Sequence, residues 1–209
     1  HPEDSVRRSS NSLEHNVEVI TCPPILILDE GEKLQRNDAR RRLGIPLDCT
    51  AVYVQLGAGE INDINSEIHL TISALTSNEG VHVILGESLI GNRISIELEN
   101  VHIIRDYPNA MYFNGFDATV QAGGYNSFHE TRQSNLPALF YPNMNTGMDD
   151  QLARCNIAAE EGWGLVIEQR NQKSITEGVS KLLQKTRMKS SDFERSGAWE
   201  LAEKLVKRN

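Results

Sequence analysis

Two glycine-rich turns carry residue types that could bind a phosphorylated ligand. Residues 123–127, Gly-Gly-Tyr-Asn-Ser, stand between an expected strand and an expected helix, and Gly57-Ala58-Gly59 follows an earlier strand in the same way. Glycine lets the backbone approach a ligand closely, and the free N–H groups at a helix N-terminus bind anions. Two such turns at one sheet edge could hold a pyrophosphate and the sugars at either end of it.

The first turn by itself is not specific. Asn62 stands where a dinucleotide-binding fingerprint needs a small residue, and Glu87 lies further on than the usual ribose-binding acid. A plain strand-to-helix turn explains Gly57-Ala58-Gly59 equally well. An NAD-dependent oxidoreductase would rest on this turn and Glu87 alone, and it would leave the second turn unexplained.

Glu130 has two competing interpretations. Ser127-x-x-Glu130 is a capping-box pattern, in which Glu130 would reach back to an N-cap N–H group. Alternatively, the Glu130 carboxylate accepts hydrogen bonds from a ribose diol. The pattern by itself favours the capping box, and one carboxylate cannot meet both demands in full.

Two further polar clusters follow expected strands. Asp149-Asp150-Gln151 begins a helix, where acidic residues are expected from the helix dipole alone; the functional alternative is recognition of sugar hydroxyl groups. Residues 105–107, Arg-Asp-Tyr, could bind a base through the backbone and an aromatic edge, or could form an ordinary loop. By pattern alone the capping role is favoured for the acidic pair.

The sequence shows no evident catalytic group. It contains no Gly-x-Ser-x-Gly elbow, no histidine cluster with metal-ligand spacing and no P-loop lysine. We therefore expect no metal and no cofactor, and a ligand that is itself a substrate.

Composition restricts the class of protein. The net charge of −8 argues against binding to nucleic acid or an anionic membrane, and the only basic run, residues 40–42, is interpreted as the solvated face of a short helix. Three widely spaced cysteines favour buried thiols in a reducing cytoplasm, and no apolar run approaches the about 18 residues of a spanning helix. The polar start without Met leads us to expect a piece of a longer protein.

Short apolar runs alternate with helical stripes along most of the chain. This alternation predicts a mostly parallel sheet covered on both faces. We expect a Rossmann-like three-layer α/β domain at 25–170, preceded by a linker at 1–24 and followed by a tail of helices at 171–209. The expected strands are residues 51–56, 81–85, 101–104, 117–120, 136–142 and 163–167.

Taken together, these segments resemble the C-terminal, donor-binding half of a GT-B fold glycosyltransferase, in the branch of the lipid II-forming N-acetylglucosaminyltransferase and the UDP-glycosyltransferases. The resemblance runs from about Pro24 to Val166, and its specific part is the joined Gly-Gly, Asn-Ser, Glu, Pro, Pro and Asp-Gln pattern between residues 123 and 151. It implies transfer of a sugar from a nucleotide-sugar, with UDP expected and dTDP or GDP left open.

The resemblance also implies roles at matching positions. The two glycine turns would bind the pyrophosphate, Glu130 would hold the ribose hydroxyls, residues 105–107 would frame the base, and Asp150 with Gln151 would read the sugar. The resulting donor site is Gly57, Ala58, Gly59, Arg105, Tyr107, Gly123, Gly124, Tyr125, Asn126, Ser127, Glu130, Asp149, Asp150 and Gln151. One departure is Ala122 with Gln121, where many family members have a histidine before the glycine.

A complete enzyme of this kind has a second, N-terminal domain that binds the acceptor and usually holds the catalytic base. We expect that domain or a partner subunit to be required, so that this fragment alone is inactive. The alternatives are a non-catalytic donor-binding subunit of a split glycosyltransferase and a GT-B fold nucleotide-sugar epimerase. The last helix, near residues 198–205, would return toward the missing domain with part of its apolar stripe exposed.

Overall fold

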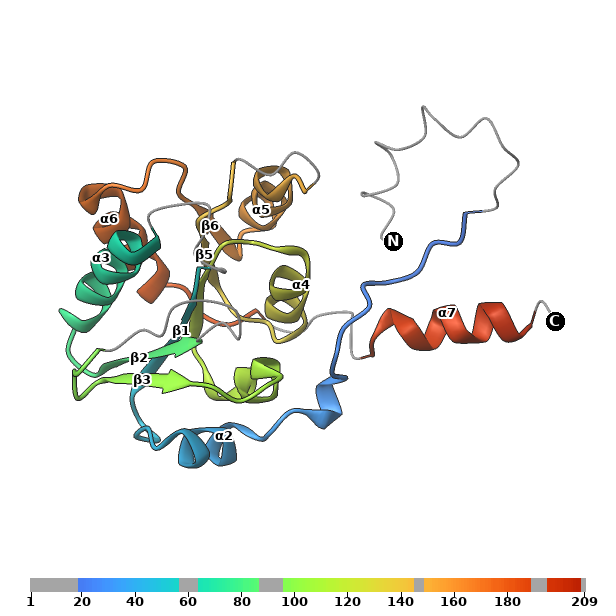
Figure 1. The fold of residues 1–209 in the computed structure, drawn as a ribbon, viewed down its shortest axis with the longest axis horizontal. Coiled ribbons are helices and arrows are strands. Elements are labelled where there is room, and N and C mark those ends of the chain that lie inside the picture. Colours follow the sequence, from blue (N-terminus) through green and yellow to red (C-terminus); the bar gives the residue numbers. More distant parts are fainter. Residues whose placement is uncertain (1–18, 57–63, 87–95, 145–148, 189–194, 208–209) are drawn as a thin grey trace.

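The chain folds around one parallel sheet, shown in a computed structural model (Figure 1). The structure describes residues 19–56, 64–86, 96–144, 149–188 and 195–207. Six strands lie in the order β3-β2-β1-β4-β5-β6, and every neighbouring pair is parallel. The strands are β1 (Thr50–Gln55), β2 (Val81–Gly86), β3 (Val101–Ile104), β4 (Ala118–Gln121), β5 (Ala138–Phe140) and β6 (Gly164–Val166). The predicted α/β class is confirmed.

The strand order reverses between β1 and β4. From β1 the chain runs outward through β2 and β3, then returns to add β4, β5 and β6 on the other side of β1. The last residues of the two central strands, Gln55 and Gln121, are register partners. In open α/β sheets, such a switch point is where ligands bind.

Helices α3 (Ile64–Thr76) and α6 (Gln172–Leu183) cover one face of the sheet (Figure 1). The spacing of Ile64, Ile68, Ile72 and Leu75 in the sequence predicts an apolar stripe on this helix, and the last three are buried against the strands. The side chain of Ile64, the first member of that stripe, lies outside the described residues. This apolar layer supports the sheet.

The other face is covered by shorter elements. They are α2 (Arg36–Leu43), the 3-10 helix η2 (Asn109–Gly115), α4 (Tyr125–Gln133) and α5 (Gln151–Glu160). Tyr53 stacks on Phe116 with 5.2 Å between ring centroids, and Phe128 packs against Phe140 and Trp163. Polar side chains at the carboxyl ends of β1 and β4 therefore emerge between these aromatic clusters and α4.

The last helix, α7 (Gly197–Val206), lies beside the N-terminal segment and apart from the sheet layers (Figure 1). The Gly197 N–H donates to the carbonyl oxygen of Pro24 at 2.8 Å, and the Leu26 N–H donates to Ser196 Oγ at 2.9 Å. A Cβ added at Gly197 would lie 1.9 Å from the Pro23 oxygen, so only glycine permits this approach. Residues 25–28 belong to no strand or helix.

The interpretation of residues 40–42 as a solvated basic face is wrong for Arg40. Its side chain is fully buried, and it donates to the carbonyl oxygens of Gly115, Leu47 and Cys49 and to Asp117 Oδ2 at 2.7 Å. Arg41, by contrast, is 64% exposed. Arg40 is buried because Asp117 and several carbonyl groups converge on one point, which local spacing does not reveal.

We predict that Arg40→Met lowers the free energy of unfolding by about 3 kcal/mol, because it leaves Asp117 and three carbonyl groups without their buried donor. Arg41→Met is the matched control and should change stability by less than about 0.5 kcal/mol. Urea denaturation of both variants measures the difference. Equal, small losses would contradict a structural role for Arg40.

Candidate functional site

The second glycine turn connects β4 to α4 at the switch point. Gly123 has φ of +80°, in the left-handed region that favours glycine, and a Cβ placed there would lie 2.3 Å from Cys155 Sγ. Both the backbone angle and the contact with α5 therefore require glycine. The turn thus brings the start of α4 against α5.

The N-terminus of α4 has no side-chain cap. The helix begins at Tyr125 with Gly124 as its N-cap residue, and the first N–H group with a helical partner is that of Phe128, which donates to the Gly124 carbonyl at 2.9 Å. The N–H groups of Tyr125, Asn126 and Ser127 lack a partner within the helix. Together with the helix dipole they form a site suited to a phosphate.

The capping-box interpretation is wrong. Ser127 is the third residue of α4, not its N-cap, and its hydroxyl donates to the Gly124 carbonyl at 3.3 Å. Glu130 therefore lies a turn further into the helix and cannot cap it. The prediction failed because the N-cap is Gly124, which has no side chain to signal a cap and lies three residues before Ser127.

Glu130 is a half-buried carboxylate on the face of α4 that points toward the sheet. Burial raises its pKa to about 7, and the positive charge of Lys33 opposes that rise. Among the residues that the structure describes, no donor is hydrogen-bonded to this carboxylate. It is available to accept hydrogen bonds from a ligand, and burial makes an unsatisfied carboxylate costly to keep.

A polar network missed by the sequence analysis lies at the ends of β1 and β2. The Tyr53 hydroxyl donates to Gln55 Oε1 at 2.8 Å and accepts from Asn109 Nδ2 at 3.0 Å. A Cβ on Gly86 would lie 2.3 Å from that hydroxyl, so glycine makes room for it. Asn109 Oδ1 is buried and has no partner among the described residues, which leaves one acceptor for a ligand or water.

Gln121 repeats this arrangement at the end of β4. Its side chain is fully buried, Nε2 donates to Thr131 Oγ1 on α4 at 2.9 Å, and Oε1 has no partner in the described part of the chain. Gln55 and Gln121 each end a strand whose buried positions are otherwise mostly apolar. A glutamine at the last position of a buried strand is the sequence signal that could have identified this edge.

The third polar cluster is joined to the glycine turn by Arg154, a residue that the sequence analysis did not select. Its guanidinium pairs with Asp149, donates to the Gly123 carbonyl at 2.9 Å and lies over the Tyr125 ring, 5.6 Å from the centroid. Arg154 thus contacts three predicted site residues, two at the β4–α4 turn and one just before α5. This contact is what brings the two polar clusters together.

The remaining residues of this cluster are already engaged within the chain. Asp150 caps α5, accepting from the Ala153 N–H at 2.9 Å, so the capping role favoured by pattern is confirmed for it. Gln151 accepts from the Asn143 N–H at 3.0 Å and donates to Asp149 at 3.3 Å. Recognition of a sugar by these side chains would use their remaining lone pairs and N–H groups.

The predicted base-binding residues lie further along the same edge. Arg105 and Tyr107 follow β3, both are exposed, and Asp106 between them is held by Arg42 and Tyr112. Three strand spacings separate β3 from β4, about 14 Å, which an extended nucleoside diphosphate can span. The structure therefore does not bring these residues into contact with the phosphate turn. Gly57, Ala58 and Gly59 lie outside the described residues.

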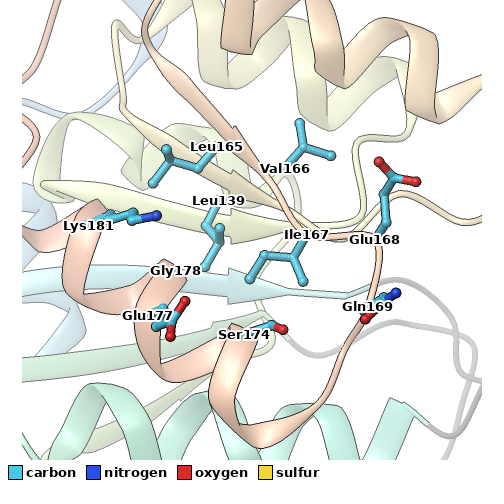
Figure 2. Close-up of a pocket in the computed structure, with 10 residues that line it drawn as sticks. All are labelled: Leu139, Leu165, Val166, Ile167, Glu168, Gln169, Ser174, Glu177, Gly178 and Lys181. Carbon is cyan, nitrogen blue, oxygen red and sulfur yellow. The ribbon is translucent and has the colours of Figure 1, made fainter.

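A separate pocket of ≈ 260 Å³ lies between β6 and α6 (Figure 2). It is lined by Leu139, Leu165, Val166, Ile167, Glu168, Gln169, Ser174, Glu177, Gly178 and Lys181. None of the residues predicted to bind the donor lines it. Two carboxylates against one ammonium group give this pocket a negative balance that disfavours a diphosphate.

Solved structures with the same fold are glycosyltransferases. Spinosyn rhamnosyltransferase SpnG with spinosyn aglycone matches with a TM-score of 0.59 at 15% identity, over 82% of this chain and 46% of its own. SpnG with thymidine diphosphate gives 0.55 at 18%, over 66% and 38%. CalG4, the calicheamicin glycosyltransferase, gives 0.52 at 18%, over 74% and 38%.

These matches confirm the resemblance to GT-B glycosyltransferases as a resemblance of fold. The chain spans less than half the length of each of those three chains. No protein-family model and no curated protein sequence matches it. In the described parts of the chain, no group of three or more metal-ligating side chains comes together, and no helix has the length and apolar character needed to cross a membrane.

We predict that Gly123→Ala lowers the free energy of unfolding by about 2–4 kcal/mol, from the left-handed backbone angle and the overlap with Cys155. Gly162→Ala is the matched control: Gly162 has φ of +83° and nothing within 4 Å of an added Cβ. It should cost only about 1 kcal/mol. Chemical denaturation of both variants separates the cost of the backbone angle from the cost of the overlap with Cys155. Equal losses in the two variants would show that the overlap with Cys155 costs nothing.

Proposed function

We propose that this chain is the nucleotide-sugar-binding part of a glycosyltransferase, with a UDP-sugar as the donor. The observation that carries the proposal is the uncapped N-terminus of α4 at the switch point, followed one turn later by the Glu130 carboxylate. The N–H groups of residues 125–127 bind the diphosphate, and Glu130 accepts from the ribose hydroxyls. The shared fold with glycosyltransferases, one of them in complex with thymidine diphosphate, supports this assignment.

The reaction in this proposal is displacement at the anomeric carbon of the sugar. An acceptor hydroxyl forms the new bond to that carbon, the bond to the diphosphate oxygen breaks, and the nucleoside diphosphate leaves. Negative charge develops on the leaving diphosphate, where N–H groups at the start of α4 stabilise it. Acceptor activation is assigned to no residue of this chain, so a further domain or subunit supplies the base.

An exposed apolar surface suits such an acceptor-side partner. Trp199, Leu205 and Val206 of α7 are 58%, 50% and 73% exposed, and Ile25 and Ile27 of the adjoining segment are about half exposed. Hydrogen bonds from Ser196 and Trp199 to Asp29 hold this helix and segment together. In the proposal this surface packs against the partner. A cytoplasmic location stays a prediction.

The first test is a calorimetric titration of the purified chain with UDP, 2′-deoxy-UDP, dTDP and GDP. We expect UDP to bind about tenfold more tightly than 2′-deoxy-UDP, and more tightly than dTDP, because only a ribose offers Glu130 two hydroxyls. The absence of saturable binding by all four nucleotides, in a folded sample, would refute the proposal. Equal affinity for UDP and 2′-deoxy-UDP would support a nucleotide site but contradict a contact between Glu130 and the 2′-hydroxyl of the ribose.

Glu130→Gln provides the second test. It should weaken UDP binding about tenfold, because a neutral amide accepts hydrogen bonds less strongly than a carboxylate. Glu203→Gln, on an exposed position of α7, is the control and should leave affinity unchanged. Unchanged affinity in Glu130→Gln would contradict the assigned role.

The same variant has a predicted effect on stability, with a sign set by the pKa of Glu130. The folded-state pKa of about 7 exceeds the ordinary 4.5, so the folded chain binds this proton more tightly than the unfolded chain does. The stability that proton binding contributes is lost as the pH rises from 4.5 to 7. After discounting for solvent screening, Glu130→Gln should stabilise the fold above pH 7 by about 1 kcal/mol, or about 3 °C, and change nothing near pH 4. Thermal melts at both pH values measure it, and destabilisation at high pH would contradict the assignment.

A further inference from the structure

Lys33 is a buried cation in the N-terminal segment. It follows the 3-10 helix η1 (Glu30–Glu32), and only 4% of the residue's surface is exposed. Its ammonium group donates to Ser134 Oγ at 2.6 Å and to Glu30 Oε2 at 2.8 Å. An ammonium group has three N–H donors, so one remains without an acceptor among the described residues.

Ser134 connects this cation to Glu130. The Ser134 N–H donates to the Glu130 carbonyl at 3.1 Å, so the two residues lie one helical turn apart at the end of α4. Side chains four positions apart share a helix face. The group that binds Ser134 therefore lies beside the same face as the carboxylate of Glu130.

Several other charged groups lie near Lys33 and Glu130, and each has its own partner or effect. Burial lowers the pKa of Lys33, while Glu30 and Glu130 oppose that change and Arg187 adds to it. Arg187 donates to the carbonyl oxygens of Phe113 and Asn114, and Glu30 accepts from Lys33 itself. On the sheet side, Glu130 faces the Tyr53 hydroxyl, whose pKa is raised by burial and by Glu130. Lys33 is thus the positive group that acts on Glu130.

We propose that the ammonium group of Lys33, held beside this face of α4 by Ser134, favours the ionised form of the Glu130 carboxylate, the form that accepts hydrogen bonds from the nucleotide. Lys33 is then a positioning residue of the donor site, contributed by a segment nearly a hundred residues earlier in the chain. This role rests on the proposed function; the electrostatic coupling between the two side chains does not. The rival explanation is structural, since a cation near the C-terminus of α4 also interacts favourably with the helix dipole.

The coupling is measured directly by ¹³C NMR titration of glutamate carboxyl groups, with the Glu130 signal assigned by its loss in Glu130→Gln. We expect a midpoint near pH 7 in the wild-type chain, and a midpoint about one unit higher in Lys33→Met, because the compensating positive charge is gone. Lys33→Arg keeps the charge and should restore the wild-type midpoint. Lys173→Met, with a side chain that is 85% exposed, should change nothing.

A midpoint in folded Lys33→Met equal to that of the wild type would overturn the proposal, and a loss of melting temperature alone would establish the structural explanation. If Lys33→Met does not fold, the reciprocal measurement decides. Glu130→Gln should lower the pKa of Lys33, followed through its ¹³Cε signal, because linkage between two charges acts equally in both directions. An unchanged Lys33 signal would overturn the proposal as well.

Nucleotide binding gives the second readout. If UDP binds only to the ionised form, Lys33→Met should weaken its apparent affinity about fivefold at pH 7 and scarcely at about pH 8.5, where both proteins are ionised. A loss of affinity that is independent of pH would refute control through ionisation. If the wild-type chain binds no nucleotide, the proposed function fails; if it binds UDP but the NMR midpoint does not move, only the inference on Lys33 fails.

Discussion

The parallel pairing of β1 with β4 is the constraint on which the rest of the structure depends. These strands are more than sixty residues apart in sequence, so no local turn fixes their register. Asp117 fixes one end: its N–H donates to the Ala51 carbonyl at 2.8 Å, its Oδ2 accepts from the Ala51 N–H at 2.8 Å, and Arg40 and Arg36 neutralise its charge. The other end is the switch point of the strand order, where open α/β sheets bind ligands.

The two ends of the central strands differ in how completely their polar groups are satisfied. At the start, Asp117 and Arg40 form a saturated set of hydrogen bonds that holds α2 against the sheet. At the carboxyl end, buried acceptors on Asn109 and Gln121 have no partner within the described residues. Unsatisfied buried acceptors cost stability, so these two acceptors are more readily explained by a ligand or ordered water than by folding.

The fold could be predicted from the sequence because it depends on local periodicity. Short apolar runs, the glycines at the ends of three strands (Gly57, Gly86 and Gly123) and stripes such as Ile68, Ile72 and Leu75 are short-range signals, and parallel pairing of the strands follows from their alternation with helices. The site was predicted only in part. Arg40, Arg154 and Lys33 act through partners distant in sequence, and no local pattern distinguishes them from solvated charges. The start of α4 was misplaced because a glycine N-cap leaves no side-chain signal.

Helix α4 explains how one element could recognise both parts of a nucleotide. Its first turn presents N–H groups and the positive end of the dipole, which suit a phosphate, while Glu130 lies three residues after Ser127, about 4.5 Å along the axis. A dipole that attracts a phosphate at the first turn gives Glu130 much less support, because its effect falls off within that turn. A second positive charge is therefore needed to keep the carboxylate ionised beneath a buried surface. In our proposal Lys33 meets that need from outside the helix, so donor recognition would depend on the correct docking of the N-terminal segment on the domain.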